Sequence, residues 1–407
     1  MVKKRSKKLF LASFLLYFIS LLSYSIFSYS LTAPNLVLST NSTFWSFQTY
    51  MWKTFFNNRE LLSQTYFALI SFSFFSYFFF VSQLLKHKIR DFKLILIIFI
   101  SLAVPLLVSN NALSYDAFNY IFNAKMVSVY GADPHIKVAL DFPDDPWVKF
   151  MHNTHTTAPY GKAWTLLSVI PFSLGFGKFL ITWLVFRLFS LLPLLAFAII
   201  LWKNQKKINF TWAIFLIFNP LILIEVISNF HNDFWMITPA VLSLLILDSK
   251  SKNKIMFVLK AILSLLLLGF SIWIKLATVI LIPIWLMLLS KSKLSLIPRF
   301  SQIMRNWPLL ASIGMFIPLL TLRSQQFHPW YLVWTIAFIP FFLKNKISNA
   351  WAIALLVLSA SSMYRYLPFL YQNNYDGNVL LWQKAISFTP FIIALILSLK
   401  HLFTKSK

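Results

Sequence analysis

Cysteine is absent from the 407-residue sequence, and charged residues are scarce at 12%. Without cysteine, the chain has no disulfide, no thiolate metal site and no cysteine nucleophile. A soluble domain carries about 25% charged residues, so this low share argues against a soluble protein. Glycine is also rare, with 7 residues in total, and the sequence contains no glycine-rich phosphate loop. The absence of such a loop gives no support for a nucleic-acid partner.

Long apolar runs recur from one end of the sequence to the other. Hydrophobic residues make up 58% of the chain, and the mean hydropathy is +0.71. Runs of about 20 apolar residues are long enough to cross a bilayer, so the sequence predicts an all-α polytopic membrane protein. The formal net charge is +26, and most lysines and arginines lie in short clusters between the runs. Such clusters indicate cytoplasmic loops beside the lipid bilayer, so we expect no nucleic-acid partner.

The basic clusters order the apolar runs into about 12 spans (range 11–13) of a single transmembrane domain, residues 1–407. The basic start Met1–Lys8 precedes an apolar run that is too long for a signal peptide. Residues 163–175 are apolar but short, which predicts a re-entrant segment or a short helix. Both termini are then cytoplasmic, in a multi-pass protein of the plasma membrane. The expected spans are Leu9–Leu31, Leu61–Leu85, Phe92–Ser109, Phe179–Trp202, Phe210–Ser228, Phe234–Leu247, Ile255–Phe270, Ile274–Leu289, Trp307–Leu322, Trp330–Leu343, Ala350–Leu367 and Ala385–Leu402.

The stretch 110–162 interrupts this pattern with a polar extracytoplasmic loop after the third span. It holds five of the 11 acidic residues of the chain. Ser114 as N-cap and Gly131 as the residue after the end predict a short helix that runs to Tyr130. Asp116 lies in the first turn, where the helix dipole favours an ionised carboxylate. It is a candidate general base for an acceptor hydroxyl, although taken alone a helix-capping role is the simpler interpretation.

Other polar residues of the loop have alternative roles. Asp133 either positions an acceptor or a metal ion, or forms an ordinary Asp-Pro turn. A divalent metal, Mg²⁺ or Mn²⁺, is an open alternative for Asp144 and Asp145, which otherwise form a solvated loop surface. Lys162 lies where the chain re-enters the membrane, so it either meets a lipid phosphate or snorkels to the interface.

A second polar island lies at the outer end of a later span. Glu225 is near the end of that span, and His231, Asn232 and Asp233 follow it. Ionisable residues at membrane depth are costly and usually face a cavity or a partner, so Glu225 and Asp233 indicate function. His231 taken alone is more often structural. Arg187, in the middle of an earlier span, either binds a phosphate or pairs with Glu225.

Further cations and aromatic residues fall on the same side of the predicted topology. Lys275, at an outer turn, and Arg323, just after a span, are candidate ligands of a phosphate. His328, Trp330 and Tyr331 follow, and aromatic residues at such a boundary usually form an interfacial belt but also stack on sugar faces. Basic clusters and apolar runs alone define this topology, yet polar motifs that are scattered in the sequence all fall on its outer side. Their common location predicts one extracytoplasmic site.

With these motifs in place, the chain resembles GT-C type glycosyltransferases, and most closely the bacterial polyprenyl-phosphate-mannose-dependent mannosyltransferases. The order and spacing of the motifs carry the resemblance across about two thirds of the chain. They are YDAFNY at 115–120, YGADPH at 130–135, APYGK at 158–162, NP at 219–220, HND at 231–233, IKL at 274–276 and HPWYLVW at 328–334.

The resemblance implies an inverting transfer of mannose or another hexose from a polyprenyl-phosphate sugar donor to an extracytoplasmic glycan or lipid acceptor. By its match to the acid of the family's first loop, Asp116 would be the catalytic base. Lys275, Arg323 and Lys162 would bind the donor phosphate, and no cofactor is implied beyond the divalent metal left open above. The residues expected to position substrates are Asp133, Tyr160, His231, Asn232, Asp233, His328, Trp330 and Tyr331.

Two other classes stay open at the level of sequence. A transporter or flippase for a lipid-linked or small solute would carry charges near the bilayer midplane and paired broken helices in inverted halves. The polar residues cluster instead at the outer face, and no internal repeat occurs, which favours the enzyme. Another lipid-linked glycan enzyme, such as a ligase or a polymerase, would share the architecture and differ mainly in its donor.

Overall fold

The fold is built from helices. The computed structural model describes residues 2–32, 37–290, 298–320 and 327–404; it is 78% helical, and no strand occurs in these ranges. Six of the described helices are long and apolar enough to cross a membrane, or seven if the bent pair Phe210–Ile217 and Pro220–Ser228 is one span. The six are Lys7–Leu31, Arg59–Lys86, Phe179–Lys203, Lys254–Ile274, Lys346–Gln372 and Gly377–Lys400. The all-helical membrane class is thus confirmed.

The other predicted spans contain shorter helices, so the number of about 12 spans is not reached by helix length. α4 (Phe92–Leu107) has 16 residues, a rise of about 24 Å against a hydrocarbon core of about 30 Å. The segments Leu276–Leu289, Trp307–Leu320 and Pro329–Phe341 are likewise short. Each of these three includes 3₁₀ turns. Apolar composition predicted where the helices lie, but it carries no information about such breaks.

Helical elements follow one another along the described residues. In chain order they are α1 (Val2–Phe27), η1 (Ser28–Leu31), α2 (Ser42–Met51), η3 (Trp52–Phe56), α3 (Arg59–Lys86), α4 (Phe92–Leu107), α5 (Asp116–Tyr130), η4 (Ala139–Asp141), η5 (Val148–Phe150), α6 (Lys162–Ser173), α7 (Phe179–Lys203), α8 (Phe210–Ile217), α9 (Pro220–Ile222), η6 (Leu223–Ser228), α10 (Asp233–Asp248), α11 (Lys254–Ile274), η7 (Leu276–Leu281), α12 (Ile282–Leu289), α14 (Pro298–Arg305), α15 (Trp307–Phe316), η8 (Ile317–Leu320), η10 (Pro329–Leu332), α16 (Val333–Ile336), η11 (Ile339–Phe341), α17 (Lys346–Met363), η12 (Tyr364–Tyr366), α18 (Leu367–Gln372) and α19 (Gly377–Thr404).

Short polar side chains fix where many of these helices begin. An asparagine or aspartate oxygen accepts a backbone N–H of the first turn, which satisfies a donor that the helix itself leaves free. Such a cap contributes about 1 kcal/mol of helix stability. The capping residues are Asn41, Asn58, Asp91, Asn209, Asn219, Asn253 and Asn345.

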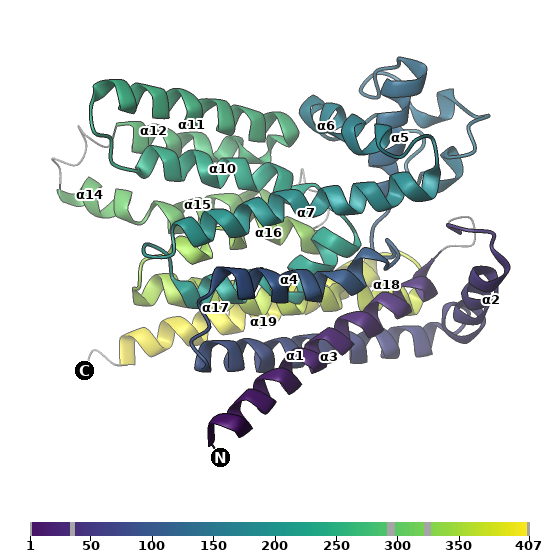
Figure 1. Ribbon diagram of the computed structural model, residues 1–407, viewed down its shortest axis with the longest axis horizontal. Helices are drawn as coiled ribbons and strands as arrows, with labels where there is room; N and C mark the ends of the chain where they lie inside the picture. Colours follow the sequence, from purple (N-terminus) through teal and green to yellow (C-terminus); the bar gives the residue numbers. More distant parts are fainter. Residues whose placement is uncertain (1, 33–36, 291–297, 321–326, 405–407) are drawn as a thin grey trace.

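The helices pack in layers with small polar contacts between them. α1 and α3 lie together at one side of the bundle in Figure 1, α10, α11 and α12 lie at the other, and α7, α15 and α17 lie between. Ser243 of α10 and Ser264 of α11 meet with their Oγ atoms 2.9 Å apart. Ser271 of α11 donates to the Met236 carbonyl oxygen at 2.7 Å. Small hydroxyl residues allow close helix approach where apolar burial gives no driving force.

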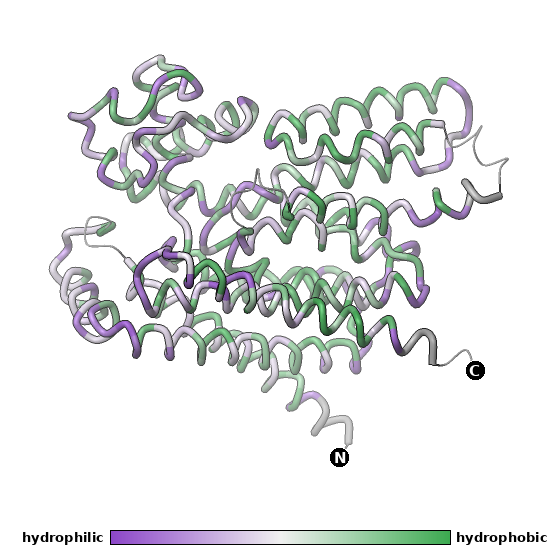
Figure 2. Tube along the Cα trace, turned by 180° about the vertical axis from the view of Figure 1, so that it is seen from behind, coloured by the Kyte–Doolittle hydropathy of each residue, from purple (hydrophilic) through white to green (hydrophobic). Residues whose placement is uncertain are grey.

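Polar segments gather at the two ends of this bundle. Figure 2 shows hydrophobic residues along the helices and hydrophilic residues around α2 and α5 at one end and in the connections at the other. The start of α1 and the end of α19 both point away from the end that carries α2, α5 and α6 (Figure 1). The polar stretch that includes α5 therefore occupies one end of the molecule.

Arg187 anchors the beginning of that polar stretch and does not pair with Glu225, so that prediction is wrong. It is fully buried in α7 and its Nη1 donates to the Leu106 carbonyl oxygen at 2.9 Å and to the Ser109 carbonyl oxygen. Its Nη2 donates to Asn111 Oδ1 at 2.8 Å. A cation favours the carbonyls at the C-terminus of a helix, here α4. The sequence does not reveal these acceptors, because they are main-chain carbonyl oxygens about 80 positions away from Arg187.

A buried ion pair closes the loop that follows α5. Asp145 is buried, and its Oδ2 lies 2.6 Å from Lys125 Nζ and accepts from Tyr130 Oη at 2.7 Å. Burial raises the proton affinity of Asp145, but the Lys125 ammonium and the Trp147 N–H outweigh it and hold its pKa below the usual range. The expectation of a solvated surface at Asp144 and Asp145 is therefore wrong for Asp145, which fastens the loop to α5.

Candidate functional site

The second polar island lies where two helices break and the chain turns. η6 is a π-helix, a form that often marks functional sites, and it carries Glu225. Phe230 has a φ of 38°, an uncommon conformation for a bulky residue that lets the chain reverse between η6 and α10. His231, Asn232 and Asp233 follow directly and are all buried. The π-helix and the turn at Phe230 therefore place these polar side chains inside the protein.

Asp116 reaches this island from the start of α5. Its side chain is 25% exposed, and its Oδ2 lies 3.6 Å from His231 Nδ1. The N-cap of α5 is Tyr115 rather than the predicted Ser114, whose Oγ accepts the Asp116 N–H at 3.3 Å. The helix ends as expected at Tyr130, with Gly131 at a φ of 58°. Asp116 thus begins the helix and faces a titratable partner, and no side-chain hydrogen bond caps this helix start.

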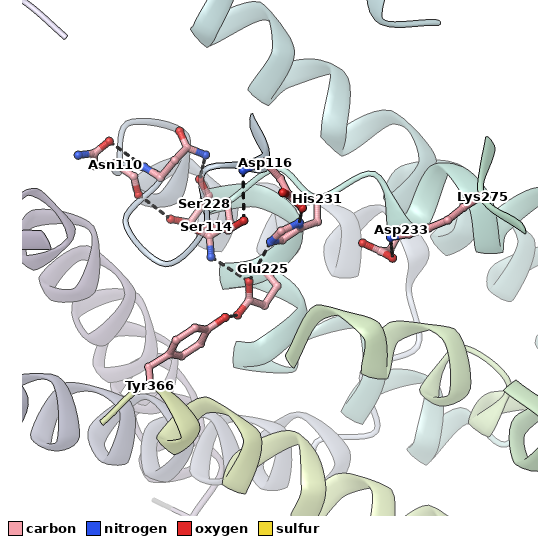
Figure 3. Close-up of polar contacts among 11 residues, drawn as sticks. Asn110, Ser114, Asp116, Glu225, Ser228, His231, Asp233, Lys275 and Tyr366 are labelled. Carbon is pink, nitrogen blue, oxygen red and sulfur yellow. Dashed lines mark hydrogen bonds and ion pairs between the residues drawn. The ribbon is translucent and has the colours of Figure 1, made fainter. Parts of the chain in front are cut away.

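His231 joins Asp116 to the buried Glu225. Its Nε2 lies 3.5 Å from Glu225 Oε2, and the imidazole is fully buried. Figure 3 shows the ring between the two carboxylates. On the ring's face, Trp330 stacks at a centroid distance of 4.0 Å, and His328 stacks on Trp330 at 4.4 Å. Trp330 and His328 are therefore parts of the cluster, and the membrane-belt interpretation of Trp330 is wrong.

Glu225 has hydrogen bonds to both carboxylate oxygens. Asn229 Nδ2 donates to Oε2 at 2.9 Å, and Tyr366 Oη donates to Oε1 at 2.9 Å. The carboxylate is fully buried, and among the described residues its ion-pair partner is His231. A buried carboxylate without a lysine or arginine is costly, so the two hydrogen-bond donors and the imidazole contact offset its burial.

Asp233 and Lys275 form a second, adjacent pair. Lys275 Nζ lies 2.9 Å from Asp233 Oδ1, and Trp334 Nε1 also donates to this oxygen. The Lys275 ammonium lies over the Tyr331 and Trp334 rings, 5.0 and 5.2 Å from their centroids. Asp233 Oδ2 is buried without a hydrogen-bond partner among the described residues. The structure therefore brings Asp233, Lys275 and Tyr331 together, with the lysine already in an ion pair.

Asp133 and Lys162 meet in a neighbouring pocket of about 310 Å³. Their side chains lie 3.2 Å apart, and Trp273 and His135 also line the pocket. The His135 backbone N–H, together with the Lys162 ammonium, holds the pKa of Asp133 below its usual range. Asp116 is not among the residues that line this pocket. Lys162 is therefore placed beside Asp133, and no ion pair among the described residues joins it to the Asp116 cluster.

Tyr160 connects the two regions. Its side chain packs against Tyr120 at a centroid distance of 4.8 Å, and burial with the nearby Asp116 charge raises the pKa of its phenol. The next residue, Gly161, donates its N–H to the Ile274 carbonyl oxygen at 2.9 Å. A Cβ at Gly161 would lie 1.8 Å from the Trp273 carbonyl oxygen, so only glycine fits. This contact joins the start of α6 to the end of α11, next to Lys275.

Buried polar atoms without a hydrogen-bond partner gather around these residues. Native proteins leave few such atoms, and each needs an explanation. Within the described ranges they include both side-chain atoms of Asn232, both ring nitrogens of His231 and Asp233 Oδ2. This concentration is typical of a site that binds a polar ligand. Asn232, a predicted substrate-positioning residue, therefore has unused hydrogen-bonding capacity.

Two arginines depart from the prediction of the phosphate-binding cations. Arg323 lies outside the described residues. Arg365, which sequence reasoning missed, is 3% exposed in η12, and its Nη1 has no hydrogen-bond partner among the residues described. Its charge acts on His328, whose pKa falls to about 3 because of burial first and then Arg365. The missed signal was a charged residue inside a predicted span.

No group of three or more histidine, aspartate or glutamate side chains with metal-binding geometry occurs in the part of the chain that the structure describes. The Mg²⁺ or Mn²⁺ alternative at Asp144 and Asp145 gains no support from this arrangement. It stays a prediction.

Apolar helices around a cluster of carboxylates, an imidazole and aromatic rings define an integral membrane protein with an enzyme-like polar site. Residues 25–291 match the family described as alpha-(1->6)-mannopyranosyltransferase, N-terminal domain. The match covers well over half of the chain, so the protein belongs to this mannosyltransferase family and is a glycosyltransferase rather than a transporter. No curated protein and no solved structure matches the chain. The matched range includes Asp116, His231 and Lys275 but not Trp330 or Arg365.

Proposed function

We propose that the protein transfers mannose from a polyprenyl-phosphate donor to a glycan or lipid acceptor at the extracytoplasmic face of the plasma membrane. The family description gives the linkage as α-(1→6), so the acceptor atom is a primary hydroxyl oxygen. An inverting displacement on a β-linked donor produces this α-linkage. The termini lie away from the end that carries α5 (Figure 1), which supports cytoplasmic termini and an active site on the opposite face.

The exposure of Asp116 carries the proposal. Its side chain is 25% exposed, whereas those of Glu225 and Asp233 are fully buried. Asp116 is therefore the carboxylate of this cluster that an acceptor can reach from the aqueous side. It lies in the first turn of α5, at the positive end of the helix dipole, and its Oδ2 contacts His231. These features suit a general base.

The donor phosphate needs positive charge where its own negative charge develops. Arg365 supports this role because it is buried with an unpaired Nη1, close to the His328 end of the cluster. Lys275 adds a nearby cation, although Asp233 already binds it. Arg323 and Lys162 remain proposed contributors. A guanidinium binds two phosphate oxygens at once, so Arg365 is the stronger candidate of the described cations.

The proposed reaction accounts for every bond and proton with groups of this cluster and the two substrates. Asp116 takes the proton from the acceptor hydroxyl while that oxygen forms a bond to C1 of mannose. The bond between C1 and the phosphate oxygen breaks, and the polyprenyl phosphate leaves with the bonding electron pair. Nearby cations stabilise the departing phosphate. Stacked aromatic residues such as Trp330, and Asn232 with its unused amide, are proposed to position the sugars, together with Tyr160, His328, Tyr331 and Asp133.

The test is Asp116→Asn in purified protein reconstituted into proteoliposomes with polyprenyl-phosphate mannose. Loss of a general base is expected to lower turnover by about 10²–10⁴-fold. Asp141→Asn is the matched control, because it removes the same charge from an exposed position of the same loop. Equal turnover in Asp116→Asn and the wild type would refute the assignment of the base.

A further inference from the structure

The imidazole of His231 has a carboxylate at each of its two nitrogens. Nδ1 lies 3.6 Å from Asp116 Oδ2, and Nε2 lies 3.5 Å from Glu225 Oε2 (Figure 3). These contacts are longer than hydrogen bonds, and neither ring nitrogen has a hydrogen-bond partner among the described residues. The order is therefore an outer carboxylate, an imidazole and an inner carboxylate. Only the outer member is exposed.

The order of these three side chains determines where a proton is stable. A neutral imidazole carries one N–H, so it can donate to one of the two carboxylates and turns a lone pair towards the other. When Nε2–H points at Glu225, the lone pair of Nδ1 faces Asp116. A proton added at Asp116 then meets a basic nitrogen. The resulting imidazolium faces a carboxylate on each side and the Trp330 ring on its face, which stabilises a cation.

We infer that His231 receives the proton from Asp116 after it has been taken from the acceptor hydroxyl, and that Glu225 is a positioning residue that orients the imidazole. The inference rests on the proposed function. The proton moves from the acceptor oxygen to Asp116 Oδ2 and then to His231 Nδ1. Glu225 keeps its charge and holds the imidazole with Nε2–H towards it. Asp116 is thereby returned to its ionised form while the product is still bound.

The surroundings of Glu225 favour this role over a purely structural one. Its side chain is fully buried, and Tyr366 and Asn229 donate to its two oxygens. A glutamine of the same shape would fill this space without the cost of a buried charge. The negative charge is of use only if a positive charge forms beside it. His231 is the residue at which that charge would form.

Several other charged or titratable groups face this cluster and belong in any interpretation of its pH dependence. Trp330 separates His231 from His328, and Arg365 and Lys275 act on His328 from farther away. The tyrosines with electrostatic interactions to Asp116 or Glu225 are Tyr24, Tyr66, Tyr120, Tyr160, Tyr331 and Tyr366. Tyrosines are neutral over the acid range, so they do not produce an acid limb.

The experiment compares pH–rate profiles of reconstituted wild type and Glu225→Gln with polyprenyl-phosphate mannose. The account expects kcat to fall roughly 10–100-fold, as for supporting residues elsewhere. The proposal assigns Glu225 no contact with the donor, so KM for the donor should not change. A negative charge beside the imidazole favours its protonation, so its removal should move the acid limb down by about 1–3 pH units.

Three further variants separate charge from shape. Glu225→Asp keeps the charge and should leave the acid limb near the wild-type position. Tyr366→Phe removes a donor that stabilises the Glu225 anion, so the cluster should hold its proton to higher pH and the acid limb should move up. Tyr17→Phe removes a buried hydrogen bond far along the chain, to the Phe218 carbonyl oxygen, and should leave the profile unchanged.

The results separate failure of this inference from failure of the proposed function. If the wild type transfers no mannose from the lipid donor, the proposed function is wrong. If the wild type is active but Glu225→Gln and Tyr366→Phe keep its acid limb, the relay is refuted and Glu225 is structural. Should Glu225→Gln not reach the membrane, the opposite shifts expected for His231→Gln (down) and Tyr366→Phe (up) decide the same question.

Discussion

The buried pair of Asp233 and Lys275 allows a prediction that separates stability from catalysis. Lys275→Met removes the ammonium and keeps most of the side-chain volume. Asp233 then remains fully buried with Trp334 Nε1 as its one remaining donor among the described residues. The Asp233→Asn/Lys275→Met double variant removes both charges at once. It leaves a neutral oxygen that can still accept from Trp334.

The expected magnitudes follow from burial. Breaking a buried ion pair by removing one partner costs about 3–5 kcal/mol. The lower end applies here, because the Lys275 side chain is 17% exposed and Trp334 keeps its hydrogen bond. In the double variant the isolated charge is gone, and a lost hydrogen bond costs about 1 kcal/mol. The two charges should therefore show a coupling of about 2 kcal/mol or more.

The assay is thermal unfolding in detergent, followed by tryptophan fluorescence and by proteolysis. Unfolding temperature should fall most in Lys275→Met and recover in large part in the double variant. Lys93→Met, at an exposed position of α4, is the matched control and should be near wild type. A double variant no more stable than Lys275→Met would refute the ion-pair reasoning. Stable single variants that lose turnover would instead favour Lys275 as a phosphate ligand.

Two further predictions concern the loop around α5. Because the folded-state pKa of Asp145 is lowered, its pairing with Lys125 stabilises the protein above the unfolded pKa of about 3.9, and this stabilisation is lost as pH falls through the folded pKa. Asp145→Asn should therefore unfold at a lower temperature than wild type at neutral pH, with the gap closing in acid; circular dichroism measures it, and a gap constant with pH would contradict the reasoning. Gly161→Ala should cost about 1–3 kcal/mol and weaken turnover, because its Cβ would meet the Trp273 carbonyl oxygen at 1.8 Å. Gly269→Ala adds a Cβ in open space within α11, so equal behaviour of the two alanine variants would show that the close approach at Gly161 is unimportant.

Much of the fold could be predicted because apolar runs and capping residues act locally. Asp91 caps α4 and Asn253 caps α11, so the helix starts lie close to where the apolar runs begin. The full-length span count could not be predicted, because 3₁₀ turns such as η7 and η10 shorten helices whose composition stays apolar. Hydropathy depends on side chains only, so it does not indicate where backbone hydrogen bonding changes from the α to the 3₁₀ pattern.

The site was predictable in its carboxylates but not in its contacts. Asp116 and His231 stand out as polar residues in an apolar chain, yet nothing local in the sequence says that they meet. Tyr366 lies 141 positions from Glu225, to which it donates a hydrogen bond. Arg187 was given the wrong partner for the same reason, since its acceptors are carbonyl oxygens at the end of α4. Pairings of this kind depend on helix packing, which single-sequence patterns do not encode.

The most direct measurement of the central claim follows the donor. Purified protein in proteoliposomes is given either polyprenyl-phosphate mannose or a mannose nucleotide, each labelled in the sugar, together with an acceptor that has a free 6-hydroxyl. The account predicts that label enters an α-(1→6) product from the lipid donor and that Asp116→Asn abolishes this transfer. Transfer from the nucleotide alone, or full transfer by Asp116→Asn, would contradict it.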